Sequence, residues 1–174
     1  EVLVTVGLAE AIFDLLCTIL DAGDEILVPD PVWMNYVNVP RLLGAVPVSY
    51  RLREENDYQM DLDEVRSKIT DKTKALVIVT PNNPTGSVLS EEVLTELAKL
   101  AVEKDILIIA DEVYERLLYD GTKHVSIASL PGMKERTFTL NGMSKAYSMT
   151  GWRLGYVSAP EEYILAMNKI HQHN

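Results

Sequence analysis

Residues 75–111 read ALVIVTPNNPTGSVLSEEVLTELAKLAVEKDILIIAD. The segment begins with the mostly apolar run Ala75–Thr80 and ends with Ile106–Ala110, in which every residue is apolar. Strands without polar alternation are typical of parallel sheets that are covered on both faces. Between them, Glu91–Glu103 carries apolar residues at helical spacing, and Ser90 precedes it as a predicted N-cap. This order predicts two neighbouring parallel strands at the centre of an α/β sheet.

The same patterns predict further strands and helices outside this segment. The further strands are Leu3–Val6, Glu25–Val28, Val46–Tyr50, Arg136–Leu140 and Leu154–Ser158. The further helices are Leu8–Leu20, Asp61–Ile69 and Glu161–His171. Clusters of Pro, Gly, Asn and Asp separate them and favour turns. We therefore expect one α/β domain over residues 1–174, with three α/β/α layers around a mainly parallel, seven-stranded sheet.

The composition restricts the classes of protein to consider. The chain has 174 residues, 47% of them hydrophobic, and a formal net charge of −10. This charge gives no general attraction to nucleic acid or to an anionic membrane, so neither partner is expected. No apolar run reaches the roughly 20 residues that span a bilayer, and no secretion signal opens the chain, so we expect a cytoplasmic location. Cys17 is the single cysteine, which excludes an internal disulfide.

Four sites follow predicted strands directly, which is where ligands bind in open α/β sheets. They are Gly7, Asn83, Asp111 and Ser144-Lys145. If their strands run parallel, all four lie at one rim of the sheet. At the end of an apolar strand, the Asp111 carboxylate needs a cation or several hydrogen-bond donors. The alternative for Asp111 is a cap of the following turn.

Lys145 lies in the stretch Ser144–Tyr156, whose glycines and hydroxyl groups favour a tight loop over a helix. An isolated lysine is usually a solvated surface group. A catalytic lysine must lose its proton near neutral pH, which requires desolvation and nearby positive charge. Arg153 is a candidate source of that charge, and Lys145 is thus the candidate catalytic amine.

Three motifs occur in order along the chain. They are Pro81-Asn82-Asn83-Pro84-Thr85-Gly86, then Ala110-Asp111-Glu112-Val113-Tyr114, and then Ser144-Lys145 with Met149-Thr150-Gly151-Trp152-Arg153-Leu154-Gly155-Tyr156. With these motifs the chain resembles the large domain of fold-type I pyridoxal-phosphate (PLP) enzymes, most closely the class I aminotransferases related to aspartate aminotransferase. The resemblance covers nearly the whole chain and implies that strand Leu154–Ser158 is antiparallel.

The resemblance implies roles for four residues around the cofactor, pyridoxal 5′-phosphate. Lys145 would hold it as an internal aldimine and then move the substrate proton. Asp111 would keep the ring nitrogen protonated. Asn83 and Tyr114 would donate hydrogen bonds to the 3′-oxygen of the ring, although Tyr114 has the alternative of packing beside the sheet. Lys145, Asp111 and Tyr114 are the predicted catalytic residues.

The resemblance also implies a phosphate site that combines a guanidinium group, a hydroxyl group and a helix N-terminus. Its residues are Arg153, Ser144, Gly7, Leu8 and Ala9. Many relatives have a hydroxyl residue at the position of Ala9, and others have a serine where this chain has Gly142. These departures predict that backbone N–H groups, Ser144 and Arg153 carry more of the phosphate binding here.

Two aromatic residues and two histidines complete the set of candidates. Trp33 would stack on the pyridine ring, with ordinary core packing as the alternative, and Tyr36 is a candidate for supporting the site from behind. His171 and His173 flank Gln172 without further ligands in the sequence, so no metal site is predicted.

The predicted activity is that of a PLP-dependent aminotransferase in amino-acid metabolism and biosynthesis, which transfers an amino group from an L-amino acid, aspartate or a similar one, to a 2-oxo acid. One alternative is another fold-type I enzyme, such as a lyase or a decarboxylase. Another is a non-catalytic PLP-binding sensor domain of a regulator. Both ends of the chain look cut, and the resemblance implies a homodimer with an N-terminal segment and a small domain that binds the substrate α-carboxylate. We expect residues 1–174 alone to be inactive.

Overall fold

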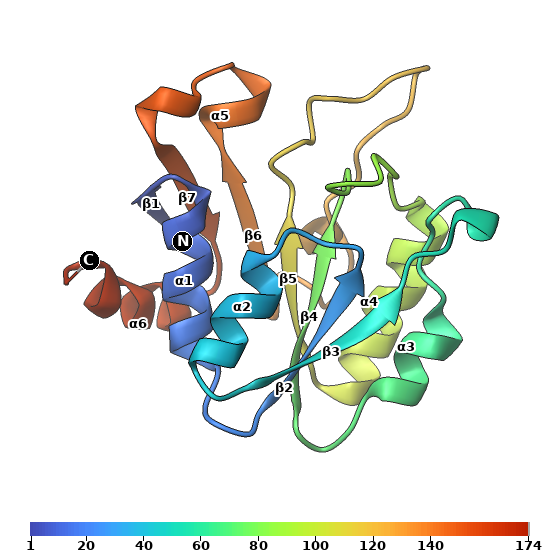
Figure 1. Ribbon diagram of the computed structural model, residues 1–174, viewed down its shortest axis with the longest axis horizontal. Helices are drawn as coiled ribbons and strands as arrows, with labels where there is room; N and C mark the ends of the chain where they lie inside the picture. The colour runs from blue at the N-terminus through green and yellow to red at the C-terminus, as the bar shows by residue number, and fades with distance from the viewer. Residues whose placement is uncertain (174) are drawn as a thin grey trace.

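The computed structural model describes residues 1–173, which contain a seven-stranded sheet (Figure 1). The strands are β1 (Val2–Val6), β2 (Glu25–Asp30), β3 (Val46–Arg51), β4 (Thr73–Val79), β5 (Leu107–Asp111), β6 (Thr137–Gly142) and β7 (Leu154–Ser158). Their order across the sheet is β1-β7-β6-β5-β4-β2-β3. Strand β7 is antiparallel to β1 and β6, whereas the other paired strands are parallel. Each predicted strand is confirmed, with ends that differ by at most two residues.

The described residues form six α-helices, of which α1 to α5 lie between strands and α6 follows β7. They are α1 (Leu8–Ile19), α2 (Asn35–Leu42), α3 (Leu62–Lys68), α4 (Glu91–Lys104), α5 (Met143–Ala146) and α6 (Glu161–His171). Helix α4 begins as predicted, since the Ser90 hydroxyl accepts a hydrogen bond from the Val93 N–H at 3.2 Å. Within residues 1–173, no helix combines the length and the apolar content that a bilayer crossing requires.

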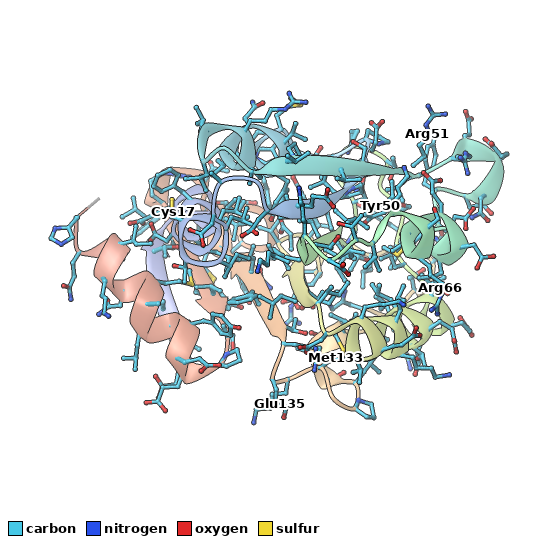
Figure 2. All side chains as sticks on the ribbon, turned by 90° about the horizontal axis from the view of Figure 1, so that it is seen from below. Cys17, Tyr50, Arg51, Arg66, Met133 and Glu135 are labelled. Atoms are coloured by element: carbon cyan, nitrogen blue, oxygen red, sulfur yellow. The ribbon has the colours of Figure 1, made fainter. Side chains whose placement is uncertain are left out.

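The sheet separates two apolar cores. Helices α1, α2 and α6 cover the face that includes Val77 and Ile109. Helices α3 and α4 cover the face that includes Leu76 and Ile108. Because successive strand residues point to opposite faces, β4 and β5 are buried on both sides. Figure 2 shows the layers from below, with Tyr50 inside, where its hydroxyl donates to the Val77 carbonyl at 2.7 Å. The predicted three layers and the central strands are confirmed.

Helix α2 is absent from the sequence predictions because Pro40 lies inside it. A proline in a helix interior costs about 3 kcal/mol relative to alanine, so a local pattern argues against a helix there. In the structure Tyr36 and Pro40 are buried, Tyr36 against the core on its face of the sheet. Tertiary packing of this short helix therefore outweighs its poor propensity.

The loop predicted around Lys145 is wrong for its first residues, because Met143–Ala146 forms the single helical turn α5. Methionine, lysine and alanine are good helix formers, and the glycines that favoured a loop, Gly151 and Gly155, lie beyond this turn. Residues Thr150–Trp152 form a short 3₁₀ turn. Helix α5 therefore gives Lys145 a fixed position directly after β6.

Strand β7 reverses the chain direction between β6 and β1, so β1, β4, β5 and β6 all run the same way. The sites that follow these strands accordingly lie at one rim of the sheet, as predicted. They are Gly7, Asn83, Asp111 and Ser144-Lys145. Figure 1 shows α5 beside the end of β6 at this rim.

Gly155 on β7 lies against the start of α1. A Cβ atom at Gly155 would stand 2.5 Å from both the Gly7 carbonyl carbon and the Leu8 nitrogen. Real Cβ atoms do not approach backbone so closely, so β7 and α1 would have to separate.

We expect Gly155→Ala to lower the free energy of unfolding by at least about 1–3 kcal/mol, the range typical of overpacking. The matched control is Gly151→Ala, since a Cβ atom there meets nothing within 4 Å. Denaturant unfolding of both variants measures the difference in stability. Equal denaturant midpoints would show that the β7–α1 contact has room for a methyl group.

Candidate active site

A cavity of about 200 Å³ opens at this rim of the sheet. Its lining residues are Leu8, Ala9, Ile12, Trp33, Val79, Asn83, Asp111, Val113, Tyr114, Gly142, Ser144, Lys145, Thr150 and Arg153. All predicted cofactor-binding residues except Gly7 are among them, and Gly7 lies behind the Arg153 guanidinium. Five lining residues were not predicted to bind the cofactor, although each lies within a few residues of a predicted one: Ile12, Val79, Val113, Gly142 and Thr150.

Asp111 is the last residue of β5 and is 4% exposed. Its Oδ2 accepts a hydrogen bond from the Tyr36 hydroxyl at 2.8 Å, and its Oδ1 accepts one from the Val113 N–H at 3.2 Å. Burial raises the pKa of Asp111 to about 6, despite these two bonds, and the neighbouring Glu112 adds to the increase. A buried carboxylate of this kind favours a cation or a protonated heteroaromatic nitrogen in the cavity.

Tyr36 supports Asp111 from α2, 75 residues away in the chain. Its side chain is fully buried, and burial together with the adjacent carboxylate raises its pKa, so the hydroxyl stays protonated and donates. The suggestion that Tyr36 acts from behind the site agrees with this contact. Tyr50 on β3 offers a comparison, since it is also buried but donates to an uncharged carbonyl.

We expect Tyr36→Phe to lower the free energy of unfolding at pH 7 by about 1.5–3 kcal/mol, the range for a hydrogen bond to a charged group. Tyr50→Phe is the matched control, with an expected loss of about 0.5–1.5 kcal/mol for a bond to a neutral acceptor. Urea unfolding of both variants measures the two losses. A smaller loss for Tyr36→Phe than for Tyr50→Phe would contradict the assignment of a charged acceptor.

Lys145 projects from α5 into the same cavity as Asp111. Its Nζ lies 5.8 Å from the centre of the Tyr114 ring, within the range of a cation–π contact. The residue is otherwise exposed, so no packing requirement explains a lysine at this position. Its amine is thus available to a molecule held against β5.

Tyr114 and Asn83 meet at the edge of the cavity. The Asn83 amide approaches the Tyr114 hydroxyl at 3.4 Å, which is longer than a strong hydrogen bond. Both side chains are partly buried, so neither is held tightly by the other or by the core. The two groups therefore offer donors to an oxygen atom of a ligand, and the alternative of Tyr114 as a purely packed aromatic residue is not favoured.

The start of α1 lies next to the Arg153 guanidinium. Gly7 is the N-cap of α1, and no side chain caps this helix end. A Cβ atom at Gly7 would stand 2.3 Å from Nη2 of Arg153, so only a glycine lets the guanidinium lie over the helix N-terminus. The helix dipole and the N–H groups of its first turn, which includes Leu8 and Ala9, add partial positive charge. A phosphate or carboxylate suits this arrangement.

Trp33 also lines the cavity and is 51% exposed. This exposure contradicts the alternative of ordinary core packing. A half-exposed indole beside a cavity offers a flat apolar face to an aromatic ligand. Thr150 and Ser144 contribute hydroxyl groups to the same cavity.

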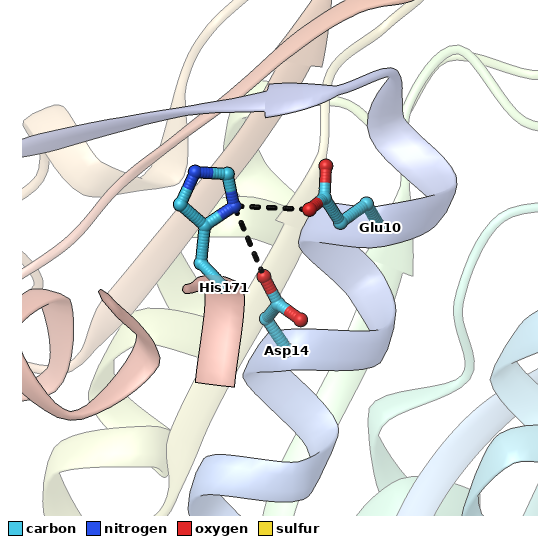
Figure 3. A group of neighbouring side chains, drawn as sticks. All are labelled: Glu10, Asp14 and His171. Carbon is cyan, nitrogen blue, oxygen red and sulfur yellow. Dashed lines mark hydrogen bonds and ion pairs between the residues drawn. The ribbon is translucent and has the colours of Figure 1, made fainter. Parts of the chain in front are cut away.

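His171 on α6 has acidic neighbours in space that its sequence surroundings do not reveal, as Figure 3 shows. Its Nδ1 lies 2.9 Å from Oε1 of Glu10 and 3.9 Å from Oδ2 of Asp14, both on α1. These contacts join α6 to α1 across residues that are distant in the chain.

Comparison with known proteins identifies the family. The profile of the family described as aminotransferase class I and II matches residues 1–174. The chain belongs to this family. The resemblance inferred from the three motifs is therefore confirmed, as is the fold expected of class I and II aminotransferases.

Individual class I and II aminotransferases match along the whole chain. The aspartate aminotransferase of Pyrococcus abyssi is 48% identical, and aromatic-amino-acid aminotransferase 2 of Thermococcus litoralis is 46% identical, each over 174 residues. The structure of Thermus thermophilus aspartate aminotransferase with maleate superposes with a TM-score of 0.96 at 45% identity. Each match covers 100% of this chain but 45% of the relative, so the chain spans a little under half of their length.

Proposed function

We propose that the protein is a PLP-dependent aminotransferase that transfers an amino group from an L-amino acid, aspartate or a similar one, to a 2-oxo acid. The observation that carries this proposal is the shared cavity of the Lys145 amine and the buried Asp111 carboxylate. Membership of the family supports it, and so do the names of the relatives. We also propose that residues 1–174 form the PLP-binding large domain.

The residues of the cavity fit pyridoxal 5′-phosphate. The anion site of Gly7 and Arg153 suits the phosphate group, because the absence of a Cβ atom leaves room for the guanidinium at the helix start. The desolvated Asp111 carboxylate suits a protonated ring nitrogen. The volume of about 200 Å³ is below the range of about 300–1,000 Å³ that holds drug-sized ligands, as expected for a single-ring molecule.

The bound cofactor supplies an electron-withdrawing ring next to the substrate α-carbon. Lys145 takes the proton from the α-carbon and returns it as a general acid, because its amine is the only side-chain amine that lines the cavity among the described residues. Asp111 would hold a proton at the ring nitrogen through a charge-assisted hydrogen bond. Tyr114 and Asn83 would donate hydrogen bonds to the 3′-oxygen of the ring, and Trp33 would pack against the ring.

Arg153 and the first N–H groups of α1 would hold the phosphate and so fix the position of the ring relative to Lys145. Ser144 precedes Lys145 on α5 and adds a hydroxyl donor to the same end of the cavity. Substrate orientation supplies a large part of the rate in such reactions. We place the group that binds the substrate α-carboxylate outside residues 1–174.

The proposed substrate class rests on the relatives. The name of the Pyrococcus abyssi protein specifies aspartate, and the Thermus thermophilus structure contains maleate, a dicarboxylate with the same number of carbon atoms as aspartate. The name of the Thermococcus litoralis protein specifies aromatic amino acids. We therefore propose aspartate as the first donor to test, aromatic amino acids as the second, and a homodimer in the cytoplasm as the working form.

The test uses the full-length protein loaded with PLP. Reduction with borohydride followed by peptide mapping is expected to place the cofactor on Lys145. Incubation with L-aspartate and 2-oxoglutarate is expected to give L-glutamate in amounts equal to the aspartate consumed. Release of ammonia or carbon dioxide instead would support a lyase or a decarboxylase. A cofactor attached at another lysine would overturn the assignment of Lys145.

A further inference from the structure

A second group of chemically active side chains lies behind the cavity, in the turns that follow β5. Residues Glu112 and Glu115 come from these turns, which are closed by the hydrogen bond from the Glu115 N–H to the Glu112 carbonyl at 2.9 Å. His124 comes from the loop before Ile127. One ligand atom from each residue lies within 4.8 Å of the other two.

Glu112 is buried, with 3% exposure, yet its Oε1 has no hydrogen-bond partner among the described residues. His124 is 12% exposed at its side chain, and neither of its ring nitrogens makes a hydrogen bond to a described residue. Buried charged or polar groups normally have partners, because leaving them without one is costly. A cation between these groups would provide the missing partner.

The spacing of the two groups agrees with a shared cation. His124 Nε2 stands 3.0 Å from Glu112 Oε2 but does not meet it in hydrogen-bond geometry. Metal–ligand bonds of about 2.0–2.2 Å that meet at tetrahedral or octahedral angles place neighbouring ligand atoms about 3–3.5 Å apart. The His124 nitrogen and the Glu112 oxygen have this separation, and no N–H group points from one to the other. They therefore resemble two ligands of one metal ion.

We propose that Glu112, Glu115 and His124 form a binding site for a divalent transition-metal ion of the zinc type. Two carboxylates and a neutral imidazole give the site a charge of −2, which matches such an ion. An imidazole ligand disfavours calcium and magnesium, which prefer oxygen ligands alone. Glu115 is the most accessible of the three, with a side chain that is 27% exposed. Among residues 1–173 its side chain forms an ion pair only with the exposed Arg116, at 3.5 Å.

The cluster of Glu10, Asp14 and His171 in Figure 3 also combines two acidic residues with a histidine, but its contacts differ. Both oxygens of Glu10 are already engaged, one with the Val6 N–H and the other with His171. That cluster therefore joins two helices through its own contacts, and it supplies a control for the proposed site.

Occupation of the site has a structural consequence for the cavity. Glu112 directly follows Asp111, and Tyr114 lies in the turns between the two glutamates. A bound ion would join these turns to the loop that carries His124. It would thus restrain the segment that positions Tyr114.

The experiment titrates Co²⁺, and then Zn²⁺ as competitor, into the metal-free full-length protein with its cofactor bound and no amino substrate present. We expect one ion per chain with a visible Co²⁺ absorption that Zn²⁺ displaces. Glu115→Gln and His124→Asn are expected to weaken binding at least about 100-fold, since loss of a group that merely supports a ligand already costs about 10–100-fold. His171→Gln, the matched control, is expected to bind like the wild type.

Glu115→Gln keeps the contact between Glu112 and His124, so it tests the ligand set even if His124→Asn fails to fold. Zn²⁺ is expected to raise the thermal midpoint of the wild type and not that of Glu115→Gln. Absence of the Co²⁺ absorption, equal binding by Glu115→Gln, or loss of binding in His171→Gln would each overturn the proposal.

Discussion

Lys145→Ala is expected to lower the transamination rate of the full-length protein by at least about 10⁴-fold, because it removes both the general base and the group that binds the cofactor covalently. The free energy of unfolding is expected to stay within about 0.5 kcal/mol of the wild type, since Lys145 is exposed and packs into no core. Steady-state rates with L-aspartate and 2-oxoglutarate measure the loss, and denaturant unfolding measures the stability.

Two further variants make this test specific. Lys145→Arg keeps the positive charge but replaces the amine with a guanidinium that does not deprotonate in proteins, so it is expected to be as inactive as Lys145→Ala. Lys169→Ala removes an exposed lysine from α6 and is expected to retain full activity. Addition of a small primary amine is expected to restore part of the rate of Lys145→Ala only. Substantial activity of Lys145→Arg would show that proton transfer uses another group.

Asp111→Asn is expected to lower the rate by about 10²–10³-fold, similar to the loss of other preorganised electrostatic groups. The asparagine has nearly the same shape, and its oxygen still accepts one of the two hydrogen bonds that Tyr36 and Val113 donate. It has no negative charge, so it no longer holds a proton at the ring nitrogen. Rate measurements with saturating PLP separate this effect from weaker cofactor binding.

The stability of Asp111→Asn distinguishes a functional from a structural role. Because the carboxylate is desolvated, removal of its charge is expected to leave the cofactor-free protein at least as stable as the wild type at pH 7. Asp111→Glu keeps the charge and is expected to be more active than Asp111→Asn. Full activity of Asp111→Asn, or its loss of stability in proportion to its loss of rate, would contradict the proposed role.

Much of the fold could be predicted from local sequence patterns. The all-apolar run before Asp111 and the helix after Ser90 predicted a central strand-helix-strand unit, and β4, α4 and β5 confirm it. Helix α2 could not be predicted in this way. Its stability comes from burial of Tyr36 and Pro40 in a core that forms only when distant segments meet.

The candidate site, like the fold, could be predicted only in part. Residues that directly follow strands, such as Asp111 and Lys145, were predicted from position and chemistry, and the structure brings them into one cavity. Contacts between segments that are distant in the chain leave no periodic pattern in the sequence, so they could not be predicted. The bond from Tyr36 to Asp111 and the close approach of His124 to Glu112 depend on the tertiary fold, so they emerge only from the structure.

The position of β7 has a consequence for how the molecule assembles during synthesis. Among the described strands, β1 pairs with β7 alone, from Val2 against Ser158 to Val6 against Leu154. During synthesis β1 is thus made more than a hundred residues before its partner strand. Until β7 is made, the backbone N–H and C=O groups of β1 have no neighbouring strand, so β1 can pair incorrectly with other chains. Because Gly155 also packs on the start of α1, this end of the cavity is complete only after β7 has joined the sheet.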